Sequence, residues 1–369
     1  MMTRSMNLMM AASMAGLFGF YLLFSAIPLY VVRGGSGEFG AGLTTGVMML
    51  ATVLAELAVP WLLSAFGHRA VMGLGLALLG LPTLLLPLSA ALPAVLAISL
   101  LRGAGLGIVV VAGTALTAEL VPAERRGEGL GLYGVAVGIP SVLGLPLGLW
   151  GSDTIGFTPV LVAAGLVPLA GLAAVRGLPR SRPAYRSAEH GTGLRDLAGP
   201  SLIFAAVTTA TGVLITFLPL AGSPQLASAA LLAQSLTTPA ARWLAGRLGD
   251  RYGHARLLPP GVLAAVTGVA LQTQVDAPVA VMAGMVLFGA GFGVLQNATL
   301  ALMFERGEPS RVSALWNLAY DAGMGVGAMG FGLVLGQTGY PLGFALVAAV
   351  MAVTLPLTRV RPACVPLPR

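Results

Sequence analysis

Gly246-Arg247-Leu248-Gly249-Asp250-Arg251-Tyr252-Gly253-His254-Ala255-Arg256 is the stretch from which the rest of the chain is best interpreted. It places three arginines, an aspartate and a histidine between two long apolar runs that almost lack charge. Arginine-rich loops between apolar runs are typical of multi-pass membrane proteins. The runs on either side are therefore candidate membrane spans.

A diverged copy of this stretch lies 186 positions earlier, at Pro60-Trp61-Leu62-Leu63-Ser64-Ala65-Phe66-Gly67-His68-Arg69. There Gly67 aligns with Gly253, and His68 aligns with His254. A second landmark has the same offset, because Arg102–Gly107 meets Phe288–Gly293 without a gap. Glu119 likewise meets Glu305, and Arg125 meets Arg311. Two landmarks that share one offset indicate that half of the chain has been duplicated.

The composition indicates an all-α membrane protein. Of the 369 residues, 57% are hydrophobic and only 9% are charged, whereas soluble domains carry about 25% charged residues. In hydrocarbon only helices and closed barrels satisfy all backbone polar groups. The apolar runs are continuous and do not alternate with polar residues, so helices are favoured over barrel strands.

The net charge of +7 comes entirely from arginine, because the sequence contains no lysine. The arginines are scattered between apolar runs and form no basic stripe, which argues against nucleic acid as a partner. The single cysteine, Cys364, excludes an intramolecular disulfide. The N-terminal apolar segment is too long for the core of a signal peptide, and we expect it to be the first span.

Twelve runs are long enough to cross a bilayer, which takes about 20 apolar residues. They are 8–32, 41–65, 70–89, 93–117, 128–150, 157–176, 200–221, 225–245, 257–275, 278–301, 312–335 and 340–358. The one long polar connection, 177–199, separates the first six from the last six. We expect an N-terminal six-helix bundle over 1–176, a linker over 177–199, and a C-terminal six-helix bundle with a short tail over 200–369.

Arginine fixes the expected orientation, because short arginine-rich loops stay on the cytoplasmic side. With the N-terminus inside, 18 of the 20 arginines fall in cytoplasmic segments. Arg33 is then in an outside loop, and Arg102 is within a span. Both termini are expected to be cytoplasmic, in a multi-pass protein of the cytoplasmic membrane.

Twelve spans in a six-plus-six repeat, a long middle loop and Gly-x-x-x-Asp-Arg-x-Gly-x-x-Arg together resemble the major facilitator superfamily, of the drug or metabolite–proton antiporter type. The signature residues are Gly246, Asp250, Arg251, Gly253 and Arg256. The first-half copy keeps Gly67 and Arg69, but it has Ser64 and Ala65 in place of the Asp-Arg pair. The resemblance implies two pseudo-symmetric six-helix bundles and a cytoplasmic gating role for these residues.

Asp250 is expected at a helix end, where a carboxylate can cap the N-terminus of a neighbouring helix. By resemblance the neighbour is the start of the fifth span, and the bond would hold the cytoplasmic side shut. Arg251 and Arg256 then have Glu119, Glu124 and Glu128 as candidate partners. The alternative is that these are solvated loop charges that set topology.

Three ionisable residues are expected deep in the membrane, where charge is costly and usually functional. Counted from the nearest span ends, Arg102 lies ~13 Å deep, Glu56 ~12 Å and Asp321 ~15 Å. Arg102 resembles the fourth-helix arginine that antiporters of this superfamily use in proton handling, and Glu56 is its expected partner. The alternatives are a structural ion pair or a snorkelling side chain for Arg102, and a hydrogen bond to Asn317 or Tyr320 for Asp321.

The resemblance also implies a substrate cavity lined by the first, fourth, seventh and tenth spans. The candidate cavity residues are Tyr21, Ser25, Thr208, Thr211, Gln296 and Asn297. Gly134, Gly138, Pro140, Gly144, Pro146 and Gly148 loosely resemble the glycine–proline signature of the antiporters, which tilts the prediction towards export. Plain helix packing explains that run nearly as well.

The leading hypothesis is a secondary transporter that exports a small organic molecule in exchange for protons by alternating access. The alternatives are a proton-independent uniporter, an importer, and a non-transporting sensor of the same fold. An enzyme is not expected, because His68, His190 and His254 all fall in predicted cytoplasmic segments and no His-Glu-x-x-His occurs. We expect no metal and no cofactor, no nucleotide-binding loop of the P-loop type, and a monomer in the lipid bilayer.

Overall fold

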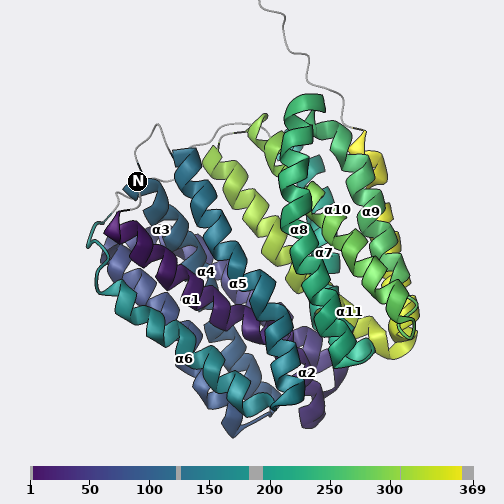
Figure 1. Ribbon diagram of the computed structural model, residues 1–369, viewed down its shortest axis with the longest axis horizontal. Helices are drawn as coiled ribbons and strands as arrows, with labels where there is room; N and C mark the ends of the chain where they lie inside the picture. Colours follow the sequence, from purple (N-terminus) through teal and green to yellow (C-terminus); the bar gives the residue numbers. More distant parts are fainter. Residues whose placement is uncertain (1–2, 122–125, 183–193, 308, 360–369) are drawn as a thin grey trace, which may run out of the picture. The chain divides into compact units, whose positions relative to one another are not determined.

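The computed structural model describes residues 3–121, 126–182, 194–307 and 309–359, with side chains described outside 126–131, 194–196 and 309–310. Every regular element within these ranges is a helix, as Figure 1 shows. This agrees with an all-α membrane protein, because backbone groups in hydrocarbon find their partners within helices.

The helices follow the predicted apolar runs closely. The α-helices are α1 (Arg4–Phe24), α2 (Ala26–Val31), α3 (Gly37–Gly80), α4 (Leu92–Leu120), α5 (Arg126–Thr154), α6 (Phe157–Val175), α7 (Leu194–Ala221), α8 (Pro224–Tyr252), α9 (Leu258–Leu271), α10 (Pro278–Phe304) and α11 (Pro309–Ala352). Shorter π and 3-10 helices are η1 (Val32–Ser36), η2 (Pro82–Leu88), η4 (His254–Leu257) and η5 (Leu355–Thr358).

Two of the long helices are kinked at a glycine in the left-handed region. Gly67 in α3 has φ 79°, and Gly339 in α11 has φ 67°. Both lie where the sequence predicts a break between spans. Within the described ranges, eight helical stretches are long and apolar enough to cross a membrane, and two of them, Arg4–Leu88 and Arg311–Thr358, join several segments. The kinks support the count of twelve spans, which stays a prediction.

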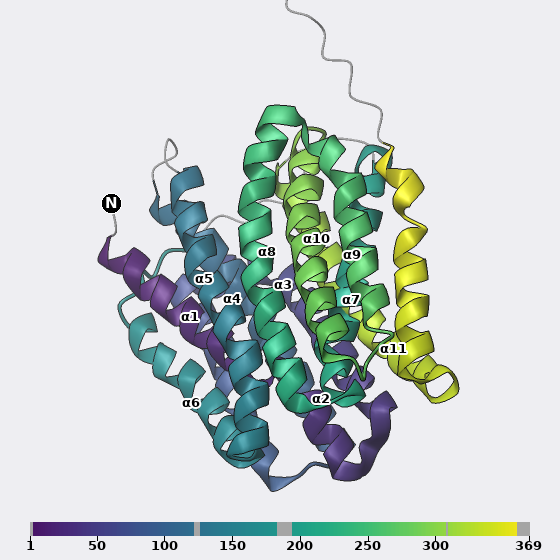
Figure 2. The ribbon, with the colours of Figure 1, turned by 45° about the vertical axis from the view of Figure 1, so that its right-hand side comes forward.

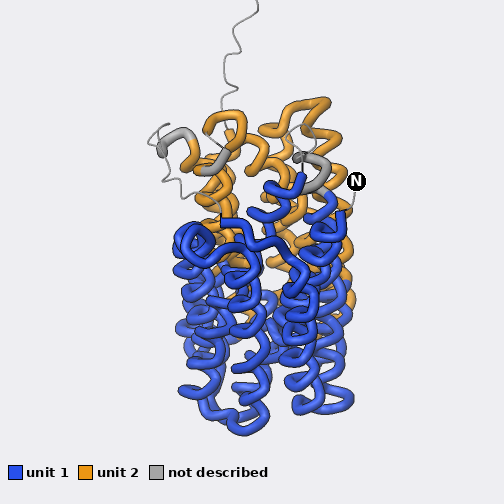
Figure 3. The backbone as a smooth tube through the Cα atoms, turned by 90° about the vertical axis from the view of Figure 1, so that its left-hand side faces the viewer, with its two compact units in different colours: residues 1–187, 211–232, 324–339 blue, residues 188–210, 233–323, 340–369 orange. Residues whose placement is uncertain are grey.

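The chain forms two compact units, coloured separately in Figure 3. Unit 1 comprises 1–187, 211–232 and 324–339, and unit 2 comprises 188–210, 233–323 and 340–369. Unit 1 thus includes parts of α7, α8 and α11 besides α1–α6. The division into two bundles at 177–199 differs from this partition and stays a prediction.

Within unit 1, α4 packs against both segments of α3 through three alternating glycines. A Cβ at Gly103 would collide with the carbonyl of Met48, and one at Gly107 would lie 2.6 Å from the carbonyl of Thr52. A Cβ at Gly105 would lie 2.7 Å from the carbonyl of Gly75, beyond the kink. Small residues of this kind let helix backbones touch in a membrane.

Unit 2 repeats this arrangement in α10, which runs beside α9 in Figure 2. A Cβ at Gly289 or Gly293 would collide with α8, and a Cβ at Gly291 would lie 2.6 Å from the carbonyl of Gly261 in α9. These glycines lie 186 positions after Gly103, Gly107 and Gly105 respectively. The offset seen in the sequence is therefore a repeated packing motif.

Candidate functional site

Arg102 is the most deeply buried charged side chain that the structure describes. It lies in α4 of unit 1 with 0% of its surface exposed. Its Nη2 donates to the backbone carbonyl of Phe20 in α1 at 3.4 Å. Its Nε and Nη1 have no hydrogen-bond partner among the described residues. Two strong donors are thus directed into the interior without an acceptor, which is costly unless another group supplies one.

The surroundings of Arg102 contain few polar groups. Ser99, one turn earlier on α4, is 1% exposed, and its hydroxyl also has no partner in the described structure. Ser99 lines a narrow gap together with Thr44 and Thr45 of α3. Ser99, Thr44 and Thr45 thus place three hydroxyls between α4 and α3, among otherwise apolar side chains.

Glu56 lies on α3, the helix that packs along α4. A Cβ added at Gly107 would lie 3.2 Å from the Cγ of Glu56, so this side chain touches α4 about one turn beyond Arg102. The structure therefore brings Glu56 and Arg102 onto neighbouring helices of unit 1. The structure does not test the ion pair expected between them, which stays a prediction.

Asp321, the third predicted coupling residue, lies in unit 2 on α11 and is 7% exposed. A ladder of aromatic rings lies beside it. Phe204 of α7 stacks on Trp316 with centroids 4.3 Å apart, and Tyr320 lies 5.9 Å from Phe204. Phe288, the repeat counterpart of Arg102, is 1% exposed and stacks on Phe292 at 5.9 Å. The second half thus has packed rings where the first half has a buried charge.

Of the predicted cavity residues, three are tied into helix packing. Ser25 is fully buried, and its hydroxyl donates to the carbonyl of Leu145 in α5 at 3.3 Å. The hydroxyl of Thr208 donates to the carbonyls of Ala205 and Ala319, each at 3.0 Å, which joins α7 to α11. Tyr21 is half-buried, and its Cβ would lie 2.6 Å from a Cβ added at Gly144. Their predicted role as cavity residues stays untested.

The remaining cavity candidates are Thr211, which is 2% exposed, and the adjacent pair Gln296 and Asn297 on α10. Asn297 faces α8, because its Nδ2 would lie 3.4 Å from a Cβ at Gly246. Its Oδ1 is buried and has no partner in the described structure. Gln296 is 7% exposed and points elsewhere, since neighbouring residues on a helix face different directions.

The predicted gating loop of the second half joins α8 to α9. Gly253 has φ 91° and ends α8, with its N–H donating to the carbonyl of Gly249 at 2.8 Å. The side chain of Asp250 is 82% exposed and lies 3.8 Å from His254 Nε2. The guanidinium of Arg251 lies over the Tyr252 ring at 5.2 Å. Arg256 lies in the following turn, η4. The predicted partner of Asp250, the start of α5, lies outside the described side chains.

The first-half loop also turns at a glycine of positive φ, but it is more deeply buried. Gly67 has φ 79° and, like His68, is buried. The backbone N–H of His68 donates to the carbonyl of Ser181 at 3.2 Å, and the Ser181 hydroxyl lies 3.2 Å from His68 Nδ1. The beginning of the linker is therefore docked on this loop. Arg69, the other residue retained from the motif, is half-buried.

Sequence reasoning missed a contact that occurs twice. His68 Nδ1 lies 3.4 Å from Glu119 Oε2 at the end of α4, and His254 Nδ1 lies 3.5 Å from Glu305 Oε1 at the end of α10. All four residues obey the 186-residue offset, so the alignment itself held the signal. A second missed contact joins Asp153 to Arg33 and to Gln225, and the repeat gives no signal for it.

Comparison with known proteins agrees with this geometry. The family model of the Major Facilitator Superfamily matches residues 9–303 and 201–364. A chloramphenicol resistance protein of Streptomyces lividans is 28% identical, over 91% of this chain and 90% of that protein. An uncharacterised MFS-type transporter of Mycobacterium tuberculosis is 26% identical over 65% of this chain, which corresponds to 32% of that longer protein.

Solved structures show the same fold at low sequence identity. A POT family transporter in complex with 5-aminolevulinic acid superimposes with a TM-score of 0.80 at 12% identity, over 96% of this chain and 94% of the other. The xylose transporter XylE of E. coli, in a partially occluded inward-open conformation, gives a TM-score of 0.77 at 13% identity, over 96% and 97% of the two chains. The chain is thus a multi-pass membrane transporter that belongs to the Major Facilitator Superfamily.

Proposed function

We propose that this transporter exports a small organic molecule across the cytoplasmic membrane in exchange for protons, by alternating access. The proposal includes twelve spans, cytoplasmic termini, two six-helix bundles on either side of the 177–199 linker, and a monomeric state. The chloramphenicol resistance relative, aligned over nearly the whole of both chains, supports export. A phenicol antibiotic is therefore the first substrate class to test.

The observation that carries proton coupling is the burial of Arg102 with two donors that have no partner among the described residues. Burying a guanidinium costs several kcal/mol unless acceptors surround it. The matching position in the other half is the buried Phe288, so the repeated packing does not itself require a charge there. An acceptor that arrives in the transport cycle, either substrate or carboxylate, would satisfy these donors.

Glu56 is the proposed proton carrier, because it lies on the helix packed against α4. When its carboxylate pairs with Arg102, the proton is released. That ionised pair holds the substrate, and when Glu56 takes up a proton again the pair is broken and the substrate leaves, so substrate and proton occupy the site in alternation. Asp321 in unit 2 is the second acid proposed to take part. This competition exchanges proton for substrate at one guanidinium.

The test is accumulation of radiolabelled chloramphenicol in energised cells that express the chain. We expect the wild type to lower accumulation, Arg102→Ala to abolish this effect, and Arg102→Lys to restore little of it, because lysine lacks the planar fork of donors. Arg4→Ala is the matched control, since Arg4 is an exposed arginine at the start of α1. Equal export by wild type and Arg102→Ala would remove Arg102 from the mechanism. Higher accumulation than in cells without the transporter would favour import.

A further inference from the structure

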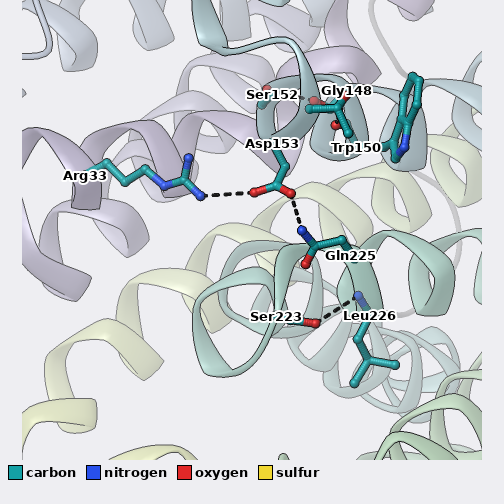
Figure 4. A network of polar contacts seen from close by, with 9 residues as sticks. Arg33, Gly148, Trp150, Ser152, Asp153, Ser223, Gln225 and Leu226 are labelled. Carbon is teal, nitrogen blue, oxygen red and sulfur yellow. Dashed lines mark hydrogen bonds and ion pairs between the residues drawn. The ribbon is translucent and has the colours of Figure 1, made fainter.

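Asp153, the next-to-last residue of α5, joins three segments that are far apart in the sequence. One carboxylate oxygen lies 3.4 Å from Nη2 of Arg33 in η1. The other accepts a hydrogen bond from Nε2 of Gln225, at the start of α8. Figure 4 shows Asp153 between the two side chains. All three residues belong to unit 1.

Arg33 is well placed to hold this carboxylate in position. Its guanidinium lies over the ring of Phe157, the first residue of α6, 5.3 Å from the ring centroid. Phe157 is itself packed on Tyr30, whose hydroxyl donates to the carbonyl of Leu86 at 2.8 Å. The Asp153 side chain is only 16% exposed, against 47% for Arg33. A shielded carboxylate with a fixed cation on one side is a preorganised acceptor for a donor on the other.

Unit 1 contains two further contacts of this kind, both between uncharged groups. The hydroxyl of Ser228, one turn further along α8, donates to the carbonyl of Pro146 in α5 at 2.8 Å. The hydroxyls of Thr45 in α3 and Thr216 in α7 lie 3.0 Å apart. Each of these contacts joins a residue before the linker to one after it, as Gln225–Asp153 does. Among these contacts, the Gln225–Asp153 bond alone is charge-assisted, a type roughly twice as strong as a neutral hydrogen bond.

We propose that the Gln225–Asp153 hydrogen bond is the latch that keeps the outer side of the transporter closed, and that Arg33 is its positioning residue. The proposal rests on the proposed alternating access and on the orientation that places Arg33 outside. Opening of the outer side separates segments before and after the linker, so the bond to Gln225 breaks while the Arg33–Asp153 pair remains. The latch then re-forms when the halves close, because Arg33 has kept the carboxylate in place.

The experiment measures opening directly, by labelling a single cysteine from outside. Thr45→Cys in a Cys364→Ser background places a thiol at a site that is 1% exposed in this structure. Right-side-out membrane vesicles are treated with a membrane-impermeant maleimide, and the labelling rate is followed by gel shift. Gln225→Glu sets a carboxylate against Asp153 and should raise the rate about tenfold, because it replaces a charge-assisted bond with repulsion.

A swap of donor and acceptor tests the bond itself. In Asp153→Asn/Gln225→Glu the amide and the carboxylate exchange places, so the rate should fall from that of Gln225→Glu to within a few-fold of the parent protein, and the remaining rise reflects the lost Arg33–Asp153 pair. Arg33→Gln should raise the rate by a few-fold and Arg33→Lys should restore it, since lysine keeps the charge. Asp276→Asn, which removes an exposed acid from the segment between α9 and α10, is the matched control and should change nothing.

Equal labelling rates in the parent, Gln225→Glu and Arg33→Gln would overturn the latch. So would a double variant that labels as fast as Gln225→Glu alone. If Gln225→Glu folds poorly, the labelling rates of the double variant and of Arg33→Gln still test the latch. Labelling from the cytoplasmic side alone would show that the proposed orientation is wrong. Because labelling reports opening and not flux, a chain that labels as expected but moves no compound would refute the proposed function and leave the latch standing.

Discussion

The two loops that follow the second helix of each half, at Gly67–His68 and Gly253–His254, occupy matching positions of the repeat and differ in their surroundings. Both glycines have positive φ, and both histidines contact a glutamate at the end of α4 or α10. His68 is 1% exposed and bonded to Ser181 of the linker segment, whereas the side chain of His254 is 15% exposed and lies near the exposed Asp250.

One repeated element thus has two different surroundings, from which we expect two different roles. In the first half, where Ser64 replaces the aspartate, the loop is fixed by buried packing under the linker segment. In the second half the loop keeps its charges and exposes them. Buried hydrogen-bonded groups are costly to separate, while exposed charges exchange partners readily. Charge-based gating on this side is therefore expected from the second loop, and a structural role from the first.

We expect the largest loss of folded protein from substitutions at glycines that pack in the same way in the two halves. Gly107→Leu and Gly293→Leu each drive a side chain into the backbone of the adjacent helix, where a Cβ already lies too close to the carbonyl of Thr52 or of Thr238. Both variants should fail to yield folded protein, as judged by size-exclusion chromatography in detergent. Gly134→Leu is the control, because no described atom lies within 4 Å of a Cβ there. Normal folding of only one of the pair would contradict the repeat.

The next largest effect on stability should distinguish the first-half loop at Gly67 from the second-half loop at Gly253. Gly67→Val should lower stability by about 3 kcal/mol, because its φ of 79° and ψ of 163° lie in a region that is essentially limited to glycine. In addition, a Cβ there would lie 2.9 Å from the carbonyl of Ser181. Gly253→Val should cost less, about 2 kcal/mol, since its φ of 91° and ψ of 131° bring similar backbone strain but no described atom lies within 4 Å of the added Cβ. Thermal unfolding in detergent measures the difference, and equal midpoints would contradict the linker docking.

A smaller difference is expected between the histidines. His68→Ala should cost about 2–3 kcal/mol, because it empties a buried position and removes the contacts to Ser181 and Glu119. His254→Ala should cost less than about 1 kcal/mol, since its carboxylate partners are largely exposed. The same unfolding assay compares them. A larger loss for His254→Ala would reverse the assignment of the structural loop.

The smallest change in stability should come from the motif charge. Asp250→Asn and Ser64→Ala should both stay within about 0.5 kcal/mol of the wild type, because Asp250 is exposed and the half-buried Ser64 bonds only the carbonyl of Trp61 in its own helix. Only Asp250→Asn should slow transport, by a few-fold, if its carboxylate closes the cytoplasmic side. Initial rates of chloramphenicol efflux from loaded cells check this. Slow transport in Ser64→Ala, or none of this slowing in Asp250→Asn, would move the gating role away from the second loop.

Most of the helical framework could be predicted from the sequence, because continuous apolar runs report membrane burial and glycines mark the breaks. The predicted gaps around 66–69 and 336–339 contain the kinks at Gly67 and Gly339. Hydropathy follows lipid contact and not helix length, so it ends the eighth run at 245 although α8 continues to Tyr252. Similarly, Pro82 and Pro87 turn the end of the third run into the 3-10 helix η2.

The site was predictable only in part. The repeat pointed to Arg102 as a charge without a counterpart, and the structure shows it buried. The same repeat contained the two His–Glu contacts. The group of Arg33, Asp153 and Gln225 could not be predicted, because its members are 120 and 72 positions apart and no local pattern connects them. Tertiary contacts of η1, the end of α5 and the start of α8 bring these side chains together.

Proton movement in proteoliposomes tests the proposed exporter most directly. Purified protein is reconstituted with a pH-sensitive dye inside, and chloramphenicol or a mixed compound library is added beside Glu56→Gln, Arg102→Ala and Asp321→Asn. The account predicts a compound-driven pH change that is lost in Arg102→Ala and in Glu56→Gln. Compound flux without a pH change, at the same rate in the wild type and all three variants, would contradict proton coupling and leave the membrane charges as structural groups.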